Sequence, residues 1–165
     1  MMEAFHIAQM KHTDWPAVSQ IYQEGIETEM ATFEQDIPEW DFWDEHHVKS
    51  CRLVAKQGEE IMGWAALSTV SSRCVYGGVA EVSVYIAKEA RGNRIGEHLL
   101  RRLITESEDQ GYWTLQSGIF PENVASIRLH EKLGFRKIGF RERIGQLNGV
   151  WKDNILMEKR SKKIG

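Results

Sequence analysis

Cysteine, basic charge and long apolar runs are all scarce in this sequence, and each scarcity argues against a class of protein. Only two cysteines, Cys51 and Cys74, occur, and their spacing suggests neither a zinc ribbon nor a disulfide framework. The formal net charge of -3 argues against general affinity for nucleic acid, which requires a basic face. The chain has no signal-peptide h-region and no apolar run long enough to span a bilayer, so we expect a cytoplasmic protein with no membrane partner.

Length and composition predict a single globular domain. A chain of 165 residues, 42% of them hydrophobic, can bury one core but is too short for two ordinary domains. No internal repeat, low-complexity tract or linker interrupts it. We therefore expect one domain over residues 1–165, with its core at about residues 3–158 and a frayed basic tail at 159–165.

Apolar periodicity predicts strands and helices in mixed order. The expected strands cover residues 5–8, 52–55, 61–67, 82–86, 113–119, 135–145 and 150–158. The expected helices run from Thr13 or Asp14 to Ile26, over 38–48, from Ile95 through Ile104, and over 124–133. Several hairpins and one strand–helix–strand crossover indicate an α+β fold around one mostly antiparallel sheet.

The turn between the strand at 82–86 and the following helix carries the first functional signal. Its sequence is Arg91-Gly92-Asn93-Arg94-Ile95-Gly96. Free backbone N–H groups and the positive end of the helix dipole meet at such a turn, and glycine lets a phosphate approach the backbone closely. The arrangement therefore predicts an anion-binding site.

Three nucleotide-binding motifs share this strand–turn–helix arrangement, and two of them do not fit. No lysine follows Gly96 as a P-loop requires, and the turn lacks the third glycine of a dinucleotide fingerprint. The turn instead resembles the pyrophosphate loop of the GNAT acetyltransferases, Gln/Arg-x-x-Gly-x-Gly/Ala. Arg94 stands where that family usually has its middle glycine, and we expect a negative φ there. The other interpretation is a structural turn with one helix-capping glycine.

A second segment strengthens the resemblance. The run from Asn123 to Phe135, which ends in Leu-Gly-Phe, is similar to the GNAT segment that follows the fifth strand. Asn123 is a good N-cap, and Gly134 suits the C′ position of the same helix. The runs Met30-Ala31-Thr32-Phe33-Glu34 and Trp151-Lys152-Asp153 resemble the branch of phosphinothricin and methionine-sulfoximine N-acetyltransferases.

The resemblance implies a sheet that splays between its fourth and fifth strands and binds acetyl-CoA there, without a metal. The pantetheine arm is expected to pair with this opening as an extra strand, and the turn to bind the pyrophosphate. The implied cofactor-binding residues are Val84, Tyr85, Ile86, Arg91, Gly92, Asn93, Arg94, Ile95, Gly96, Glu97, Asn123 and Lys132. For Asn123, a role as helix cap alone is the other interpretation.

Acetyl transfer to an amine requires a base, an oxyanion donor and a proton for the leaving thiolate. We expect Glu81 to be the general base and the backbone N–H of Tyr85 to be the oxyanion donor. His130 occupies the position where many GNAT enzymes have a tyrosine that acts as general acid, and we assign His130 as the general acid that protonates the thiolate. The other interpretation of Glu81 is an exposed glutamate at the end of a strand, and that of His130 is a histidine packed in the core.

The acceptor is expected to be a small molecule with a primary amine beside a carboxylate, as the resemblance to the phosphinothricin branch implies. Thr32 and Phe33 are expected to contact it, although that loop equally suits a plug of the core. Arg73 is the predicted partner of the carboxylate, with Tyr76 nearby. The family also implies a homodimer. A protein N-terminal acetyltransferase and a catalytically silent coenzyme A-binding module are the competing functions.

Overall fold

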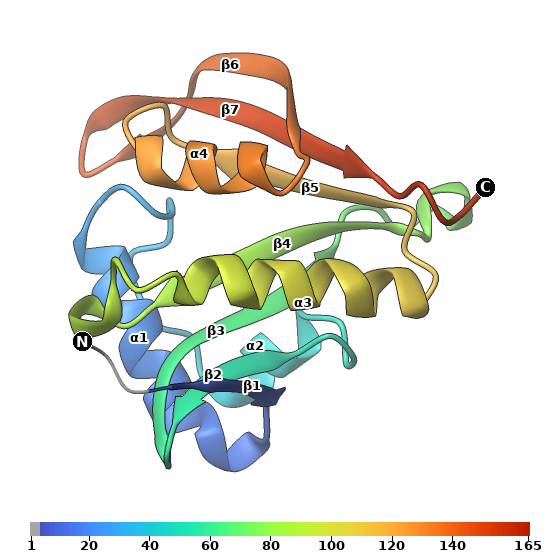
Figure 1. The fold of residues 1–165 in the computed structure, drawn as a ribbon. Helices are drawn as coiled ribbons and strands as arrows, with labels where there is room; N and C mark the ends of the chain where they lie inside the picture. Colours follow the sequence, from blue (N-terminus) through green and yellow to red (C-terminus); the bar gives the residue numbers. More distant parts are fainter. Residues whose placement is uncertain (1–3) are drawn as a thin grey trace.

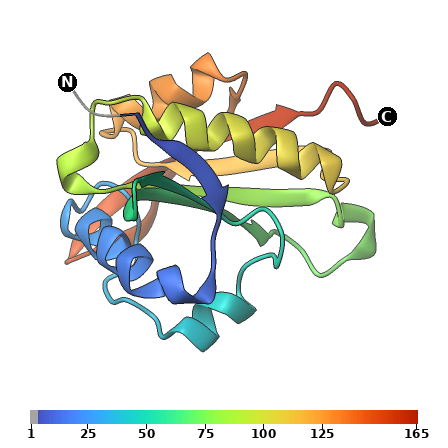
Figure 2. The same cartoon turned by 60° about the horizontal axis from the view of Figure 1, so that its bottom comes forward.

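A computed structural model describes residues 4–165. One seven-stranded sheet has helices on both of its faces (Figure 1). The strands are β1 His6–Gln9, β2 Leu53–Gln57, β3 Glu60–Thr69, β4 Val79–Ile86, β5 Thr114–Ile119, β6 Arg136–Leu147 and β7 Val150–Arg160. The α-helices are α1 Trp15–Glu27, α2 Trp40–Glu45, α3 Ile95–Asp109 and α4 Val124–Lys132. α3 and α4 lie on one face, and α1 and α2 lie on the other (Figure 2).

The strand order is β1-β2-β3-β4-β5-β7-β6, and the described neighbours are antiparallel except for β4 and β5. The β4–α3–β5 crossover explains this exception, since two parallel neighbours need a long connection, usually a helix. The predicted α+β class, with a mostly antiparallel sheet, is confirmed.

β4 and β5 diverge soon after they begin. They pair only from Val79 to Glu81 on β4, opposite Thr114 to Gln116 on β5. On its other edge, β4 stays paired with β3 as far as Ile86. Residues 82–86 therefore have a strand neighbour on one side only, and the two strands form a V-shaped opening near the middle of the sheet.

Alternation along β4 assigns its side chains to two different cores. Ala80 and Val82 belong to the core beneath α3, whereas Tyr85 packs with the aromatic core beneath α1 and α2. Glu81 and Ser83 share the parity of Tyr85 and therefore face the α1 side. Both cores meet at the strand that borders the opening.

The local signals for turns and caps agree with the structure. Asn123 caps α4, with its Oδ1 accepting from Ser126 N at 3.3 Å, and Gly134 follows the helix with a φ of +98°. Asn148 and Gly149 join β6 to β7 with φ values of +50° and +80°, as a two-residue hairpin of type I′ requires.

Two boundaries differ from expectation. α2 covers only residues 40–45, although its Trp43 does point inward and is 1% exposed. The predicted frayed tail is instead attached at its start: Arg160 is the last residue of β7, and Ser161 N donates to Trp113 O at 2.8 Å. Backbone pairing with β5 and this bond hold the first tail residues against the domain.

Candidate functional site

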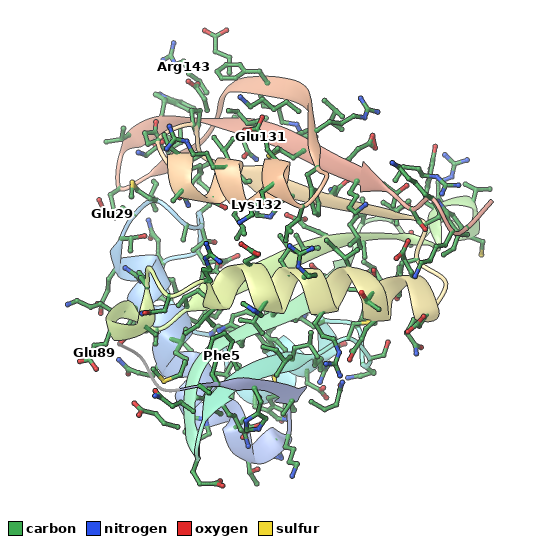
Figure 3. All side chains as sticks on the ribbon, in the orientation of Figure 1. Phe5, Glu29, Glu89, Glu131, Lys132 and Arg143 are labelled. Carbon is green, nitrogen blue, oxygen red and sulfur yellow. The ribbon has the colours of Figure 1, made fainter. Side chains whose placement is uncertain are left out.

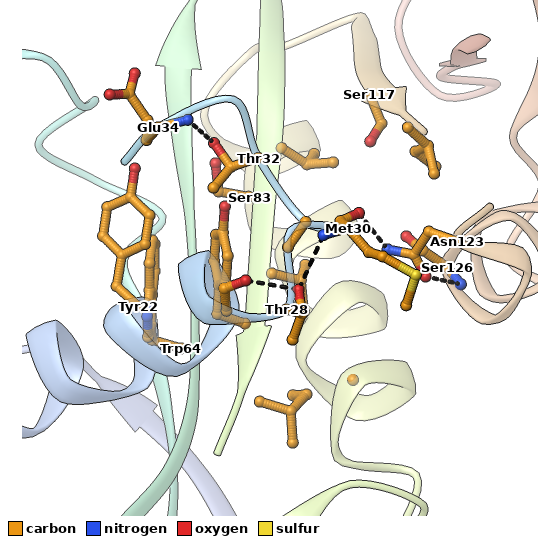
Figure 4. A pocket seen from close by; sticks show the side chains of 18 of the residues that line it. Tyr22, Thr28, Met30, Thr32, Glu34, Trp64, Ser83, Ser117, Asn123 and Ser126 are labelled. Atoms are coloured by element: carbon orange, nitrogen blue, oxygen red, sulfur yellow. Dashed lines mark hydrogen bonds between the residues drawn. The ribbon is translucent and has the colours of Figure 1, made fainter. Parts of the chain in front are cut away.

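A cavity of about 1160 Å³ occupies the opening between β4 and β5 and extends to both faces of the sheet. On the α3 face, the β4–α3 turn and α4 line it. On the α1 face, the long connection between α1 and α2 and the outer residues of β3 and β4 line it. Figure 4 shows this connection crossing over the side chains of the cavity. A molecule bound here can therefore be reached from both faces.

The β4–α3 turn brings most of the predicted anion-binding residues to the cavity. The residues of the turn that line it are Arg91, Gly92, Arg94, Ile95, Gly96 and Glu97. Gly92 has a φ of +84°, which glycine adopts without strain. α3 is 15 residues long, so its first-turn N–H groups and its dipole favour an anion at this end.

Arg94 differs from expectation, because its φ is +64° and not negative. It is the N-cap of α3, outside the helical geometry that we assumed for it. A left-handed conformation costs an L-residue about 1–2 kcal/mol. This position therefore favours glycine for its dihedral angles as well as for its small size.

Gly96 lies within the first turn of α3. A Cβ added there would lie 3.4 Å from Leu129 Cδ2 and 3.7 Å from Ile86 Cγ1, which is ordinary contact. The fold therefore tolerates a methyl group at this position.

Three predicted cofactor-binding side chains are occupied within the protein. Asn93 Nδ2 donates to Ala90 O at 3.0 Å and does not line the cavity. Lys132 reaches from α4 towards α3, where its Nζ lies 2.6 Å from Glu97 Oε1 (Figure 3). This ammonium is the main cause of the lowered pKa of the Glu97 carboxyl. Asn123 does line the cavity, but its Nδ2 donates to Met30 O at 3.2 Å while its Oδ1 caps α4.

Backbone alternation decides which residues of β4 can serve the opening, and it corrects one prediction. Ala87 N donates to Met62 O of β3 at 2.8 Å, whereas Gly78 O accepts from Trp113 N on the β5 side. Because successive residues point their N–H and C=O groups to opposite neighbours, Tyr85 directs its own towards β3. Val84 and Ile86 therefore present theirs to the opening, and Tyr85 N–H does not.

Glu81 lies at the start of the opening and lines the cavity from the α1 face. Burial raises the pKa of its carboxyl above the ordinary 4.5, and the Arg141 guanidinium partly opposes the shift. A carboxylate with a raised pKa is a stronger base than an exposed one. Both the position and the environment of Glu81 suit the base role predicted for it.

His130 lies on α4, 4% exposed, with its ring edge-on to Phe135. Its Nδ1 is 2.7 Å from Ser126 O, and since a carbonyl only accepts, Nδ1 carries the proton. Burial lowers the pKa of the ring below its ordinary 6.5, so the neutral form prevails at neutral pH. Nε2 then has no proton to donate and is a buried acceptor with no partner in residues 4–165. The predicted acid role thus conflicts with the state of this histidine in the free protein.

The connection between α1 and α2 covers the acceptor side of the cavity. Thr32 Oγ1 accepts from Glu34 N at 3.1 Å, and Phe33 packs edge-on against Phe120 with 4.7 Å between ring centroids. Thr32 and Phe33 both line the cavity. Asn148, in the β6–β7 hairpin, accepts from Gln35 Nε2 at 3.3 Å. The connection therefore spans from α1 to the C-terminal hairpin.

Three aromatic rings in mutual contact form a wall that the sequence analysis missed. Trp64 and Tyr85 stack with 5.0 Å between centroids, and Tyr22 lies 5.0 Å from Tyr85. Burial raises the pKa of the Tyr22 hydroxyl to about 12, so the wall stays neutral at physiological pH. The alternation of Trp64, Ala66 and Ser68 on β3 was the available signal, since these residues share a face.

Arg73 and Tyr76 do not reach the cavity in this chain. Both are exposed in the β3–β4 connection, and the Arg73 guanidinium lies 5.6 Å from the centroid of the Tyr76 ring. The connection lies at the end of β4 opposite the β4–α3 turn (Figure 1). Proximity to Glu81 in the sequence was a poor guide, because the chain folds outward there before β4 begins.

Two kinds of feature were sought in the part of the chain that the structure describes: clusters of metal ligands and helices able to span a membrane. Between residues 4 and 165, no three His, Cys, Asp or Glu side chains gather to hold a metal ion. Over the same residues, no helix combines the length and apolarity needed to cross a bilayer.

Comparison with known proteins agrees with this geometry. The acetyltransferase (GNAT) family matches residues 14–135. Phosphinothricin N-acetyltransferase of Alcaligenes faecalis is 30% identical over 160 residues, which cover 91% of this chain and 79% of that protein. L-methionine sulfoximine/L-methionine sulfone acetyltransferase of Pseudomonas aeruginosa is 29% identical over 151 residues, 88% of each chain.

Solved structures give the same result. Ribosomal-protein-alanine N-acetyltransferase from Brucella melitensis has a TM-score of 0.88 at 30% identity and covers 94% of this chain and 99% of its own. A phosphinothricin acetyltransferase from Sinorhizobium meliloti, in complex with AcCoA, has a TM-score of 0.88 at 25% identity, with coverage of 97% and 90%. This chain therefore belongs to the acetyltransferase (GNAT) family and is an acyltransferase with acetyl-CoA as its co-substrate.

Proposed function

We propose that this protein transfers an acetyl group from acetyl-CoA to the primary amine of a small amino acid-like acceptor, of the phosphinothricin or methionine sulfoximine type. The main support is one cavity through the splayed sheet, with an anion-binding turn on one face and the half-buried Glu81 carboxylate on the other. Both relatives compared above are named for amino acid analogues of this type.

The chain offers distinct groups for each part of the co-substrate. First-turn amides of α3, at the end of the helix that borders the cavity, suit the pyrophosphate. Backbone groups of Val84 and Ile86, which have no strand partner towards β5, suit a pantetheine arm that pairs as an extra strand. Lys132 and Asn93 support the site indirectly. Lys132 holds α4 to α3 through Glu97, and Asn93 stabilises the turn through its bond to Ala90 O.

The chemistry is a direct attack of the amine on the thioester. Glu81 takes a proton from the ammonium, and the freed lone pair adds to the thioester carbonyl to form the C–N bond and a tetrahedral oxyanion. Collapse of this intermediate breaks the C–S bond. A backbone N–H of Val84 or Ile86 stabilises the oxyanion. The thiolate, whose parent thiol has a pKa of about 8.5, takes the second proton that the amine nitrogen loses as the amide forms, and Glu81 releases the first proton to solvent. His130 Nε2 can accept a hydrogen bond from that thiol.

Protein N-terminal acetylation is the second candidate, because the Brucella neighbour is named as a ribosomal-protein-alanine N-acetyltransferase. The covered acceptor side argues against it: the α1–α2 connection crosses to the β6–β7 hairpin and leaves less room for a peptide.

We also propose a single-domain cytoplasmic homodimer, and the exposed Phe140, Ile144, Val150 and Trp151 of the hairpin supply an apolar surface for association. Light scattering on a sizing column tests the dimer.

Release of free coenzyme A thiol tests the main proposal. The acceptor panel contains phosphinothricin, methionine sulfoximine, methionine sulfone and a hexapeptide that begins with alanine. We expect thiol release with the amino acid analogues and little with the peptide. Faster turnover of the peptide would favour the second candidate. Calorimetric binding of acetyl-CoA without thiol release from any amine would indicate a silent coenzyme A-binding module.

A further inference from the structure

We propose that Arg141, on β6, binds the carboxylate of the acceptor, while Glu81 faces its amine. This inference rests on the proposed function and specifies how an amino acid is distinguished from a simple amine. It also replaces Arg73, which lies in the β3–β4 connection at the far end of β4; Arg141 is not itself in the cavity wall, but it lies directly opposite Asn154, which is.

The register of the C-terminal hairpin places Arg141 beside the cavity. Arg141 lies directly opposite Asn154 of β7, and directly opposed residues extend their side chains from the same face. Asn154 lines the cavity, and a Cβ added at Gly118 would lie only 2.8 Å from its Nδ2. The side chain of Arg141 therefore leaves the sheet next to a residue of the cavity wall.

This face is the one from which Glu81 projects. Ile155 and Met157 of β7 belong to the core beneath α3, so Asn154 and Arg141 point to the opposite face. Glu81 projects to that face too, because its neighbours Ala80 and Val82 face α3. α1 and α2 cover the β1–β4 half of this face, away from β6 and β7 (Figure 2). A small molecule there can lie between Glu81 and Arg141.

Arg141 has no competing partner in the described chain, unlike three other cations of the hairpin. Arg136 pairs with Glu158 at 3.2 Å. Arg143 lies 5.7 Å from the ring centroid of Trp151, and Lys152 lies 5.7 Å from that of Phe120. Arg141 forms no ion pair with any residue from 4 to 165, yet its charge reaches the Glu81 carboxyl.

Asn154, which lies opposite Arg141 and lines the cavity, gives independent evidence for a bound ligand. The Oδ1 atom of Asn154 is buried and has no hydrogen-bond partner among the described residues. A buried acceptor without a partner is unfavourable, and a ligand N–H that fills the position removes the penalty. An ammonium next to Glu81 and Asn154, with its carboxylate directed to the Arg141 fork, satisfies all three groups.

A pair of matched acceptors isolates the role of Arg141. Methionine sulfone carries the carboxylate, and 3-(methylsulfonyl)propan-1-amine is the same molecule without it. Arg141→Gln keeps an N–H donor but shortens the side chain and removes the charge. We expect the KM for methionine sulfone to rise about 10- to 100-fold, as loss of a charge-assisted hydrogen bond predicts, with the KM for the amine unchanged. Arg141→Lys should restore part of the loss.

Arg136→Gln is the matched control, because it removes a guanidinium from the same strand that is already paired with Glu158. It should leave both KM values at those of the parent. Calorimetric titration of methionine sulfone into parent and Arg141→Gln protein gives a second measurement that needs no turnover. Circular dichroism confirms that each variant is folded.

The outcomes separate this inference from the proposed function. Equal methionine sulfone binding and KM in parent and Arg141→Gln protein would overturn the role of Arg141. So would a parent enzyme that acetylates the amine and not the amino acid, although acetyl transfer itself would stand. Thiol release from neither acceptor, with acetyl-CoA bound, would overturn the proposed function, and the titration alone would then decide whether Arg141 binds the zwitterion.

Discussion

Replacing Arg94 with glycine should stabilise the protein, even though it removes a side chain from the N-terminus of α3. Arg94 has a φ of +64°, which costs an L-residue about 1–2 kcal/mol and glycine nothing. Glycine loses part of this gain, about 0.4–1 kcal/mol, because it adds freedom to the unfolded chain. The backbone bond from His98 N to Arg94 O at 3.2 Å persists in the variant. The net gain should be about 0.5–1 kcal/mol.

The assay is thermal unfolding of the free protein. For a chain of 165 residues, 1 kcal/mol corresponds to about 2–4 °C in Tm, so Arg94→Gly should melt about 1–4 °C higher than the parent. Gly92→Ala is the mirror-image control, since its φ of +84° is equally unfavourable for alanine and its Cβ would meet no atom. It should melt at a lower temperature. A lower Tm for Arg94→Gly would refute the argument from strain.

Three further outcomes follow from the site. Glu81→Gln should lower kcat/KM by about 10²- to 10⁴-fold with acetyl-CoA affinity unchanged, and the deficit should shrink as pH rises and more acceptor arrives deprotonated; parental activity across the pH range would exclude the base role. Gly96→Ala should leave Tm equal or higher, because alanine favours helix by up to about 1 kcal/mol, yet weaken acetyl-CoA binding in calorimetry; unchanged affinity would remove the pyrophosphate from this turn. Burial lowers the pKa of His130 below 6.5, so its contribution to stability is present above pH 6.5 and is lost as pH falls through the folded-state pKa. His130→Gln should therefore flatten the fall in the urea midpoint between pH 7.5 and 5. An equally steep fall in the variant would assign the effect to His47, whose pKa is lowered in the same way.

Local sequence signals determined most of the fold. Period-two alternation located the strands, helical periodicity located α3, and capping residues such as Asn123 and Gly134 set the limits of α4. These signals work because they act within a few residues of each other, where backbone sterics and short-range hydrogen bonds dominate. The strand–turn–helix at residues 80–111 could be predicted for the same reason, and it indicated an anion-binding site.

The sequence by itself could not say which groups face the acceptor. Arg73 is eight positions from Glu81 and does not reach the cavity, whereas Arg141 is 60 positions away and lies on the same face. Which strand lies next to which is a property of the whole sheet, and the antiparallel register of β6 with β7 brings Arg141 opposite Asn154. No local pattern contains that information.

Tertiary structure also decided the state of groups whose identity the sequence already supplied. Alternating backbone direction turned Tyr85 N–H to β3 and left Val84 and Ile86 to the opening. A helical carbonyl, that of Ser126, accepts a hydrogen bond from His130 Nδ1–H, which leaves Nε2 as a buried acceptor. The sequence therefore determined the family and the fold, and it supplied candidate residues for the reaction. Their protonation and direction followed from desolvation and from partners that only the folded chain brings within reach.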